Sequence, residues 1–154
     1  MFKGYFGREE ATREAFSEGW FKTGDIAEQS SDGYVRLLGR TSVDILKSGG
    51  YKLSALEIEE TLRENPAVAE VAVIGLPDEV WGDRVVAVVV ATAGREAECS
   101  EEALRTWAKE RMAPYKVPRE VVVVTELPRN PMGKVVKPEL VKAILEGAIG
   151  GGRS

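Results

Sequence analysis

Three runs rich in β-branched residues constrain the fold of this chain more than any other feature. They cover residues 68–74, 85–92 and 121–125, and a helical pattern from about residue 100 to residue 111 separates the second run from the third. Near-continuous valine runs are typical of strands whose faces are covered by other elements. The pattern therefore predicts an α+β fold, with a small mixed sheet of three strands covered by helices.

Three helices are expected around these runs. A short one is predicted over residues 9–16. Ser54, with Glu57 three residues later, forms a capping box that opens a second helix, and Asn65-Pro66 ends it. Pro138 is favoured in a first turn and opens the last helix. The apolar faces of the last two helices comprise Ala55, Ile58 and Leu62, and Leu140, Val141, Ile144 and Leu145.

A two-stranded ribbon is predicted ahead of the sheet. Residues 26–28 and 34–38 flank the segment 30–33, which ends in Asp32-Gly33. An Asp-Gly pair between apolar stretches is a strong hairpin signal, because both residues tolerate positive φ.

Composition excludes several classes of function. The 154 residues, 44% of them hydrophobic, suffice for one compact unit. The 21 basic residues are dispersed among 25 acidic ones, so we expect no nucleic-acid partner. The chain has no histidine, which removes imidazole-based triads and the commonest metal ligand, and we expect no metal site in it.

The remaining composition signals concern location and redox chemistry. Cys99 is the only cysteine and is interpreted as a spectator thiol of a reducing compartment. No apolar run reaches the length of a membrane span, and residues 1–4 do not open a signal peptide. These features predict a cytoplasmic protein without a membrane span.

One loop singles out a candidate functional lysine. Residues 127–134 read LPRNPMGK, so that two prolines and a glycine precede Lys134. Prolines restrict φ, and Asn130 and Gly133 tolerate the left-handed conformation of tight turns. The loop is therefore expected to be stiff and to present Lys134 in a defined direction. An ordinary surface turn with a solvated lysine is the alternative.

Four motifs in order resemble the late motifs of the adenylate-forming acyl-CoA synthetases. They are residues 19–25 (GWFKTGD), residues 39–40 (GR), residues 47–52 (KSGGYK) running into 56–59 (LEIE), and residues 131–134 (PMGK). Residues 39–52 and 77–82 are most similar to malonyl-CoA synthetases. The resemblance implies the C-terminal fragment of such an enzyme, since the large N-terminal domain with its phosphate loop and acyl pocket is missing.

The resemblance also implies a domain division. Residues 1–38 would be the end segment of the large domain, and residues 39–146 would be the mobile C-terminal lid domain. Residues 147–154 are rich in glycine and are expected to form a flexible tail.

Site residues follow from the matched motifs. Lys134 would be the catalytic lysine of adenylation, and Asp25 and Arg40 would bind the ribose or phosphates of ATP. A turn-forming aspartate and a surface ion pair are their respective alternatives. Ser42, Val43 and Asp44 would form the hinge, although one extra residue here leaves the pivot open.

A second group would serve CoA. The pantetheine arm would be lined by Lys47, Ser48, Gly49, Gly50 and Tyr51, for which a strand-to-strand turn without a ligand is the alternative. Arg84, Lys116 and Arg119 could contact its nucleotide end, and Trp81 is interpreted as a packing residue.

The implied reaction joins a carboxylic acid to CoA at the expense of ATP, with Mg²⁺ bound mainly by the missing domain. Malonate is implied as the acid by the narrower resemblance. Two alternatives remain: an adenylation domain that loads a carrier protein, and a stand-alone nucleotide- or CoA-binding module. The fragment alone is expected to be inactive.

Overall fold

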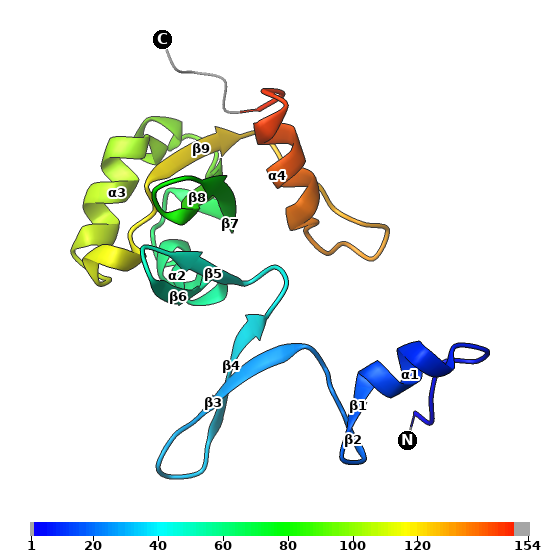
Figure 1. Cartoon of the computed structure of the whole chain (residues 1–154). Helices are drawn as coiled ribbons and strands as arrows, with labels where there is room; N and C mark the ends of the chain where they lie inside the picture. Colours follow the sequence, from blue (N-terminus) through cyan, green and yellow to red (C-terminus); the bar gives the residue numbers. More distant parts are fainter. Residues whose placement is uncertain (1, 150–154) are drawn as a thin grey trace.

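The three valine runs form the long strands of a mixed sheet. In the computed structural model, which describes residues 2–149, they are β7 (Val68–Asp78), β8 (Gly82–Ala91) and β9 (Glu120–Val124) (Figure 1). β7 pairs with β8 antiparallel, and β9 pairs with β8 parallel. The predicted mixed α+β architecture is therefore confirmed.

The sheet has five strands instead of the expected three. A hairpin of β5 (Ile45–Ser48) and β6 (Tyr51–Ser54) joins it where Ser48 pairs with Gly82 at the start of β8. Both strands are only four residues long and carry lysines, so they lack the valine pattern of the other three. The hairpin brings the glycine pair of residues 49–50 to the end of β8.

Both faces of the sheet are covered, as the near-continuous apolar strands required. One core cluster packs α2 (Ala55–Arg63) and α3 (Glu101–Lys109) on one face, and a second cluster packs α4 (Lys137–Leu145) on the other. Alternate residues of β8 serve the two clusters, because successive side chains of a strand point to opposite faces. Those facing α2 and α3 are Val85, Ala87 and Val89, and those facing α4 are Val86 and Val88.

The helix boundaries follow the predicted signals. The Ser54 hydroxyl accepts a hydrogen bond from the Glu57 amide (3.2 Å), which caps α2. Ser100 caps α3 in the same way through the Ala103 amide (3.3 Å), and Pro138 lies in the first turn of α4. Two 3₁₀ turns, η1 (Glu96–Cys99) and η2 (Pro114–Lys116), flank α3.

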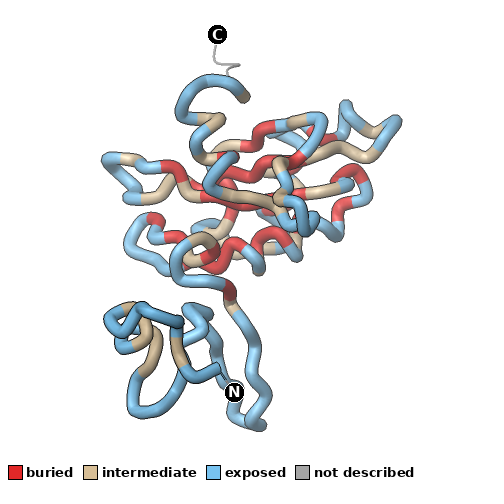
Figure 2. The backbone as a smooth tube through the Cα atoms, turned by 90° about the vertical axis from the view of Figure 1, so that its right-hand side faces the viewer, coloured by how far each residue is buried: buried red, intermediate tan, exposed pale blue. Residues whose placement is uncertain are grey.

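The N-terminal part extends away from this sheet (Figure 1). It comprises α1 (Glu9–Ala15), the short pair β1 (Phe16–Ser17) and β2 (Trp20–Phe21), and the ribbon of β3 (Asp25–Gln29) and β4 (Val35–Arg40). The predicted helix and ribbon are both present, with Gly33 at a φ of +90° in the ribbon turn. No residue from 2 to 38 is buried, and Figure 2 shows this part mostly in pale blue with short tan stretches.

The C-terminal end is packed as far as the structure describes it. Ala148 donates a backbone hydrogen bond to the Ala143 carbonyl (2.8 Å), and Ile149 packs against the second core cluster. The tail expected over residues 147–154 is thus held against α4 through residue 149, and residues 150–154 lie outside the described range.

Cys99 is buried, and burial first, then the nearby Glu98 charge, raises the pKa of its thiol, which disfavours the reactive thiolate. Between residues 2 and 149, no helix has both the length and the apolar character of a membrane span.

Candidate functional site

Lys134 lies on the loop between β9 and α4, and hydrogen bonds within the loop define its shape. The Asn130 amide donates to the Lys134 carbonyl (2.9 Å), and the Asn130 side-chain oxygen accepts from the Lys134 amide (3.0 Å). Gly133, at a φ of +80°, donates to the Asn130 carbonyl (2.8 Å). These hydrogen bonds close the loop into a tight turn, the conformation that Asn130 and Gly133 predicted.

This turn is also fastened to the sheet. The Arg129 guanidinium donates to the Gly133 carbonyl (2.7 Å) and to the Glu70 carboxylate of β7 (2.5 Å). Lys134 itself is exposed, and within residues 2–149 no hydrogen bond or ion pair engages its ammonium group. A free cation on a stiff, fastened turn is suited to binding an anionic group.

Asp25 and Arg40 lie opposite each other on the ribbon. They are paired residues of β3 and β4, and the Arg40 Nε lies 3.4 Å from the Asp25 Oδ1. The Arg40 side chain is 68% exposed, so this ion pair is weak and can open for a ligand. The structure thus brings together the two residues expected to bind ATP, whereas the loop of Lys134 lies apart from the ribbon in Figure 1.

The glycine pair forms the two-residue turn of the β5–β6 hairpin. Gly49 and Gly50 have φ values of +58° and +83°, which a two-residue hairpin turn of this kind requires. The Gly49 amide donates to the Trp81 carbonyl (2.9 Å), whereas a Cβ at Gly50 would meet nothing within 4 Å. Both the predicted strand-to-strand turn and an open face beside Gly50 are therefore present.

Aromatic and cationic side chains surround this turn. The Arg119 guanidinium lies over the Trp81 ring, 3.4 Å from its centre, and Tyr51 stacks on Tyr115 with ring centres 4.5 Å apart. The turn before Trp81 is held by Asp78, whose pKa is lowered first by the Val80 amide and then by the Trp81 amide. Trp81 is thus both packed against Gly49 and partly exposed.

The other two basic residues expected near the CoA nucleotide are already paired. Lys116 lies 2.7 Å from the Glu57 carboxylate, and Arg84 lies 3.6 Å from that of Glu120. Lys116 also lies 6.0 Å from the centre of the Tyr115 ring. Arg119 is the one of the three that lies over Trp81, the ring packed against Gly49.

The expected hinge residues form a turn whose last member is anchored. Ser42 is exposed and Val43 is half-buried, whereas Asp44 is buried. The Asp44 carboxylate accepts a hydrogen bond from the Arg40 amide (2.9 Å) and pairs with the Lys137 ammonium (2.5 Å). Asp44 therefore connects the segment of Arg40 to α4.

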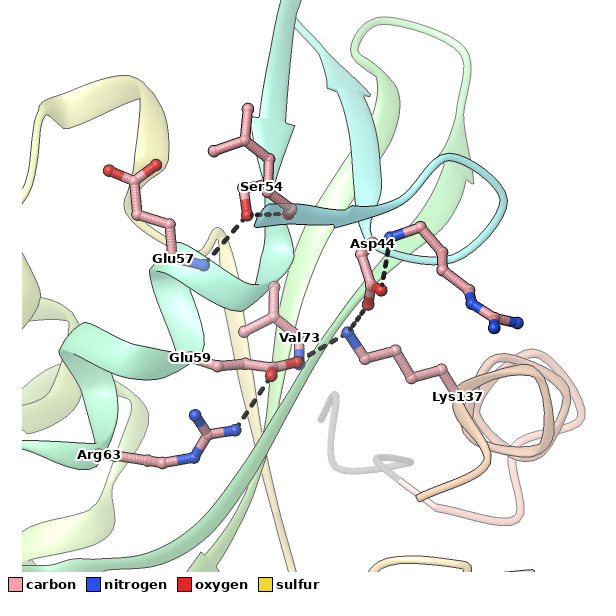
Figure 3. Close-up of polar contacts among 9 residues, drawn as sticks. Asp44, Ser54, Glu57, Glu59, Arg63, Val73 and Lys137 are labelled. Carbon is pink, nitrogen blue, oxygen red and sulfur yellow. Dashed lines mark hydrogen bonds and ion pairs between the residues drawn. The ribbon is translucent and has the colours of Figure 1, made fainter. Parts of the chain in front are cut away.

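Lys137 and Glu59 complete a buried polar network that the sequence reasoning missed (Figure 3). The Lys137 Nζ lies 2.8 Å from the Glu59 carboxylate, which also accepts from the Val73 amide (2.8 Å) and pairs with Arg63 (3.1 Å). Two signals could have revealed it. A lysine at the start of a helix opposes the helix dipole, and Glu59 falls on the apolar face of its helix, so each needs a specific partner.

Gly39 lies close to Asp44 of this network, so a side chain at position 39 is expected to destabilise the fold. Gly39 has a φ of +119°, and a Cβ there would lie 2.4 Å from the Asp44 Cβ. Backbone strain and the clash together are expected to lower the free energy of unfolding of a Gly39→Ala variant by about 2–4 kcal/mol. Urea unfolding of the 154-residue chain measures this change.

Gly94→Ala is the matched control for that variant. Gly94 has a φ of +82°, but a methyl group there would meet nothing within 4 Å, so it reports the backbone strain alone. We expect a loss of about 1–2 kcal/mol there. Equal losses at the two sites would show that the contact with Asp44 does not matter.

Comparisons with known proteins give the family of the chain. A family model described as the AMP-binding enzyme C-terminal domain matches residues 57–134. The mitochondrial malonate–CoA ligase ACSF3 of Bos taurus is 50% identical over 145 residues, which are 94% of this chain and 24% of the relative. The malonate–CoA ligase of Arabidopsis thaliana is 47% identical, with 94% of this chain and 25% of the relative covered.

A solved structure agrees with these relatives. The crystal structure of ATP-bound MatB from Rhodopseudomonas palustris is 38% identical, covers 92% of this chain with 28% of its own, and has a TM-score of 0.83. The chain thus spans about a quarter of the length of the curated relatives it matches. The motifs, the fold and the family model agree, and the chain belongs to the family of AMP-binding enzyme C-terminal domains.

Proposed function

We propose that this chain is the C-terminal part of an acyl-CoA synthetase, in which it is the mobile lid over a larger catalytic domain. The observation that carries the proposal is the free Lys134 ammonium on its stiff loop. The relatives that are malonate–CoA ligases support the same reading. The parent enzyme would convert a carboxylic acid, ATP and CoA into an acyl-CoA, AMP and pyrophosphate.

In the first half-reaction, the acid attacks the α-phosphorus of ATP and pyrophosphate leaves. The two reacting groups are both anionic, and negative charge builds up on the phosphoryl oxygens in the transition state. Lys134 would bridge the carboxylate and the α-phosphate. Asp25 would accept hydrogen bonds from the ribose hydroxyls, and Arg40 would bind the ribose or the phosphates once their mutual ion pair opens.

In the second half-reaction, the CoA thiol attacks the acyl carbon of the adenylate and AMP leaves. The lid would rotate at Ser42, Val43 and Asp44, so that the segment from Lys47 to Tyr51 replaces the Lys134 loop at the active site. The open face of Gly50 lets the backbone approach a narrow pantetheine chain. Arg119 on Trp81 offers a cation and a ring beside it for the nucleotide of CoA.

The division between lid and large domain is proposed to lie near residue 38. Residues 2–38 bury no side chain and expose large apolar ones, among them Phe6 and Trp20 at 106% and 80%. Exposed apolar surface of this kind marks an interface. We infer that residues 1–38 pack on the large domain and that residues 39–146 move as the lid. Residues 147–154 follow the lid in the sequence.

Malonate is the proposed acid, because the curated relatives carry that activity in their names. Mg²⁺ is proposed to accompany ATP and to be bound mainly by the large domain. For the compartment we propose the cytoplasm, with mitochondria as the alternative that the name of the bovine relative favours. Cell fractionation with an antibody against the full-length protein separates the two.

The test is ATP- and CoA-dependent thioester formation by the full-length protein, with malonate offered beside medium-chain and aromatic acids. A preference for malonate supports the whole proposal. Turnover of another acid would change only the proposed substrate and would leave the proposed mechanism intact. Adenylate formation without any thioester would favour a carrier protein as the acceptor. The isolated 154-residue chain should form neither product, since catalysis by it would contradict the role of a lid.

A further inference from the structure

We propose that Lys137 is a positioning residue for adenylation, which joins the segment of Arg40 to the loop of Lys134 through the buried carboxylates of Asp44 and Glu59. The inference rests on the proposed function, since it assigns to Lys137 the task of holding the catalytic lysine in place. Figure 3 shows the ammonium between the two carboxylates, which come from the hinge turn and from α2.

The contacts of Lys137 are those of a fixed group. Its Nζ lies 2.5 Å from the Asp44 Oδ1 and 2.8 Å from the Glu59 Oε1, and the three side chains are only 13%, 12% and 4% exposed. Each carboxylate is in turn held by a backbone amide, that of Arg40 for Asp44 and that of Val73 for Glu59. Charge-assisted bonds with fixed partners define position as well as energy.

The start of α4 depends on these contacts. Val136, at the N-cap position, provides no side-chain cap for the helix. A cavity of ≈ 320 Å³ lies beside the first turn, lined by residues that include Val43, Ile74, Lys137 and Val141. Close packing therefore does not fill the space between this turn, the hinge and β7. Leu140 anchors the middle of α4 in the core, and Lys137 anchors its beginning.

A short, stiff connection links Lys137 to Lys134. Only Val135 and Val136 lie between them. The Val136 amide donates to the Pro128 carbonyl (2.9 Å), and Val135 forms a β-bridge with Arg129, so the connecting backbone is paired with the incoming arm of the loop. Displacement of Lys137 is therefore transmitted to Lys134, and small misplacements of a catalytic group are costly in rate.

The same network reaches Arg40, the other cation proposed to bind ATP. Asp44 accepts from the Arg40 amide while it pairs with Lys137, so one carboxylate fixes the backbone of Arg40 and the start of α4 together. In this arrangement, the two cations proposed for ATP, Arg40 and Lys134, are placed relative to each other across the hinge by residues that need not touch the nucleotide.

The experiment measures ATP–pyrophosphate exchange by the full-length enzyme, with the acid that the unmodified enzyme prefers. Lys137→Met is expected to slow adenylation at least about tenfold. Lys142→Met is the matched control, because Lys142 is a 73% exposed lysine of the same helix. Lys137→Arg keeps a cation between the carboxylates and should restore most of the rate. If the methionine variant does not fold, Lys137→Gln, which retains hydrogen-bond donors, replaces it in the same measurement.

A double-mutant cycle distinguishes positioning from a merely structural role. If Lys137 acts through Lys134, the change to Met or Gln should have less than a roughly twofold effect in a Lys134→Ala background. Thioester formation from added acyl-adenylate should also fall less than adenylation does. Equal losses in both backgrounds, or in both half-reactions, would overturn the proposal. Absence of adenylation in the unmodified enzyme would instead refute the proposed function.

Discussion

Replacing Lys134 by alanine in the full-length enzyme is expected to slow acyl-adenylate formation by about 10²- to 10³-fold, the usual cost of removing one preorganised charge-stabilising donor. The donor is preorganised here because the turn is closed by Asn130 and fastened to β7 through Arg129. The contribution proposed for Lys134 is electrostatic and acts where charge develops on the phosphoryl oxygens. ATP–pyrophosphate exchange at saturating acid and ATP measures the loss.

The variant should retain its stability, since the Lys134 side chain has no partner among residues 2–149. The urea midpoint of the variant is therefore expected to match that of the unmodified protein, and Lys142→Ala controls for the loss of an exposed lysine. Thioester formation from added acyl-adenylate should be affected much less, because that step is proposed to use the glycine turn instead of Lys134. Near-normal adenylation by Lys134→Ala would refute the assignment of the catalytic lysine.

The largest expected loss of stability is that of Ile58→Ala. Ile58 lies in the middle of α2, is 1% exposed and belongs to the core cluster between α2, α3 and the sheet. Truncation removes buried apolar surface and leaves a cavity, which together lower the free energy of unfolding by about 2–5 kcal/mol. Urea unfolding of the 154-residue chain, followed by far-UV circular dichroism, measures the change.

Leu56→Ala is the control in the same helix. Leu56 is 37% exposed, so its truncation should cost well under half as much as that of Ile58. A similar loss for both variants would mean that α2 does not pack on the sheet through the face described above.

Local chemistry made much of the fold predictable. The Asp32-Gly33 turn, the Ser54 cap and the Pro138 start each act within a few residues, and each lies where the sequence placed it. The valine runs likewise form strands, because β-branched residues favour extended backbone, and their near-continuous apolar character matches the cover found on both faces of the sheet. The β5–β6 hairpin escaped prediction as part of the sheet, since it joins β8 through the single pair of Ser48 with Gly82.

The residues alone indicated the family, through four motifs in order that resemble those of known enzymes, and the same motifs predicted the candidate site. Local chemistry also predicted the turns, because a glycine pair favours a tight hairpin turn and a proline-bracketed loop restricts the backbone before Lys134. Only the tertiary structure decided which charges meet. Asp44, Glu59 and Lys137 come from segments far apart in the chain. The role of Lys137 at the start of its helix depends on the two carboxylates that folding brings into contact with it. Ion pairing depends on distance and burial, which one sequence does not contain.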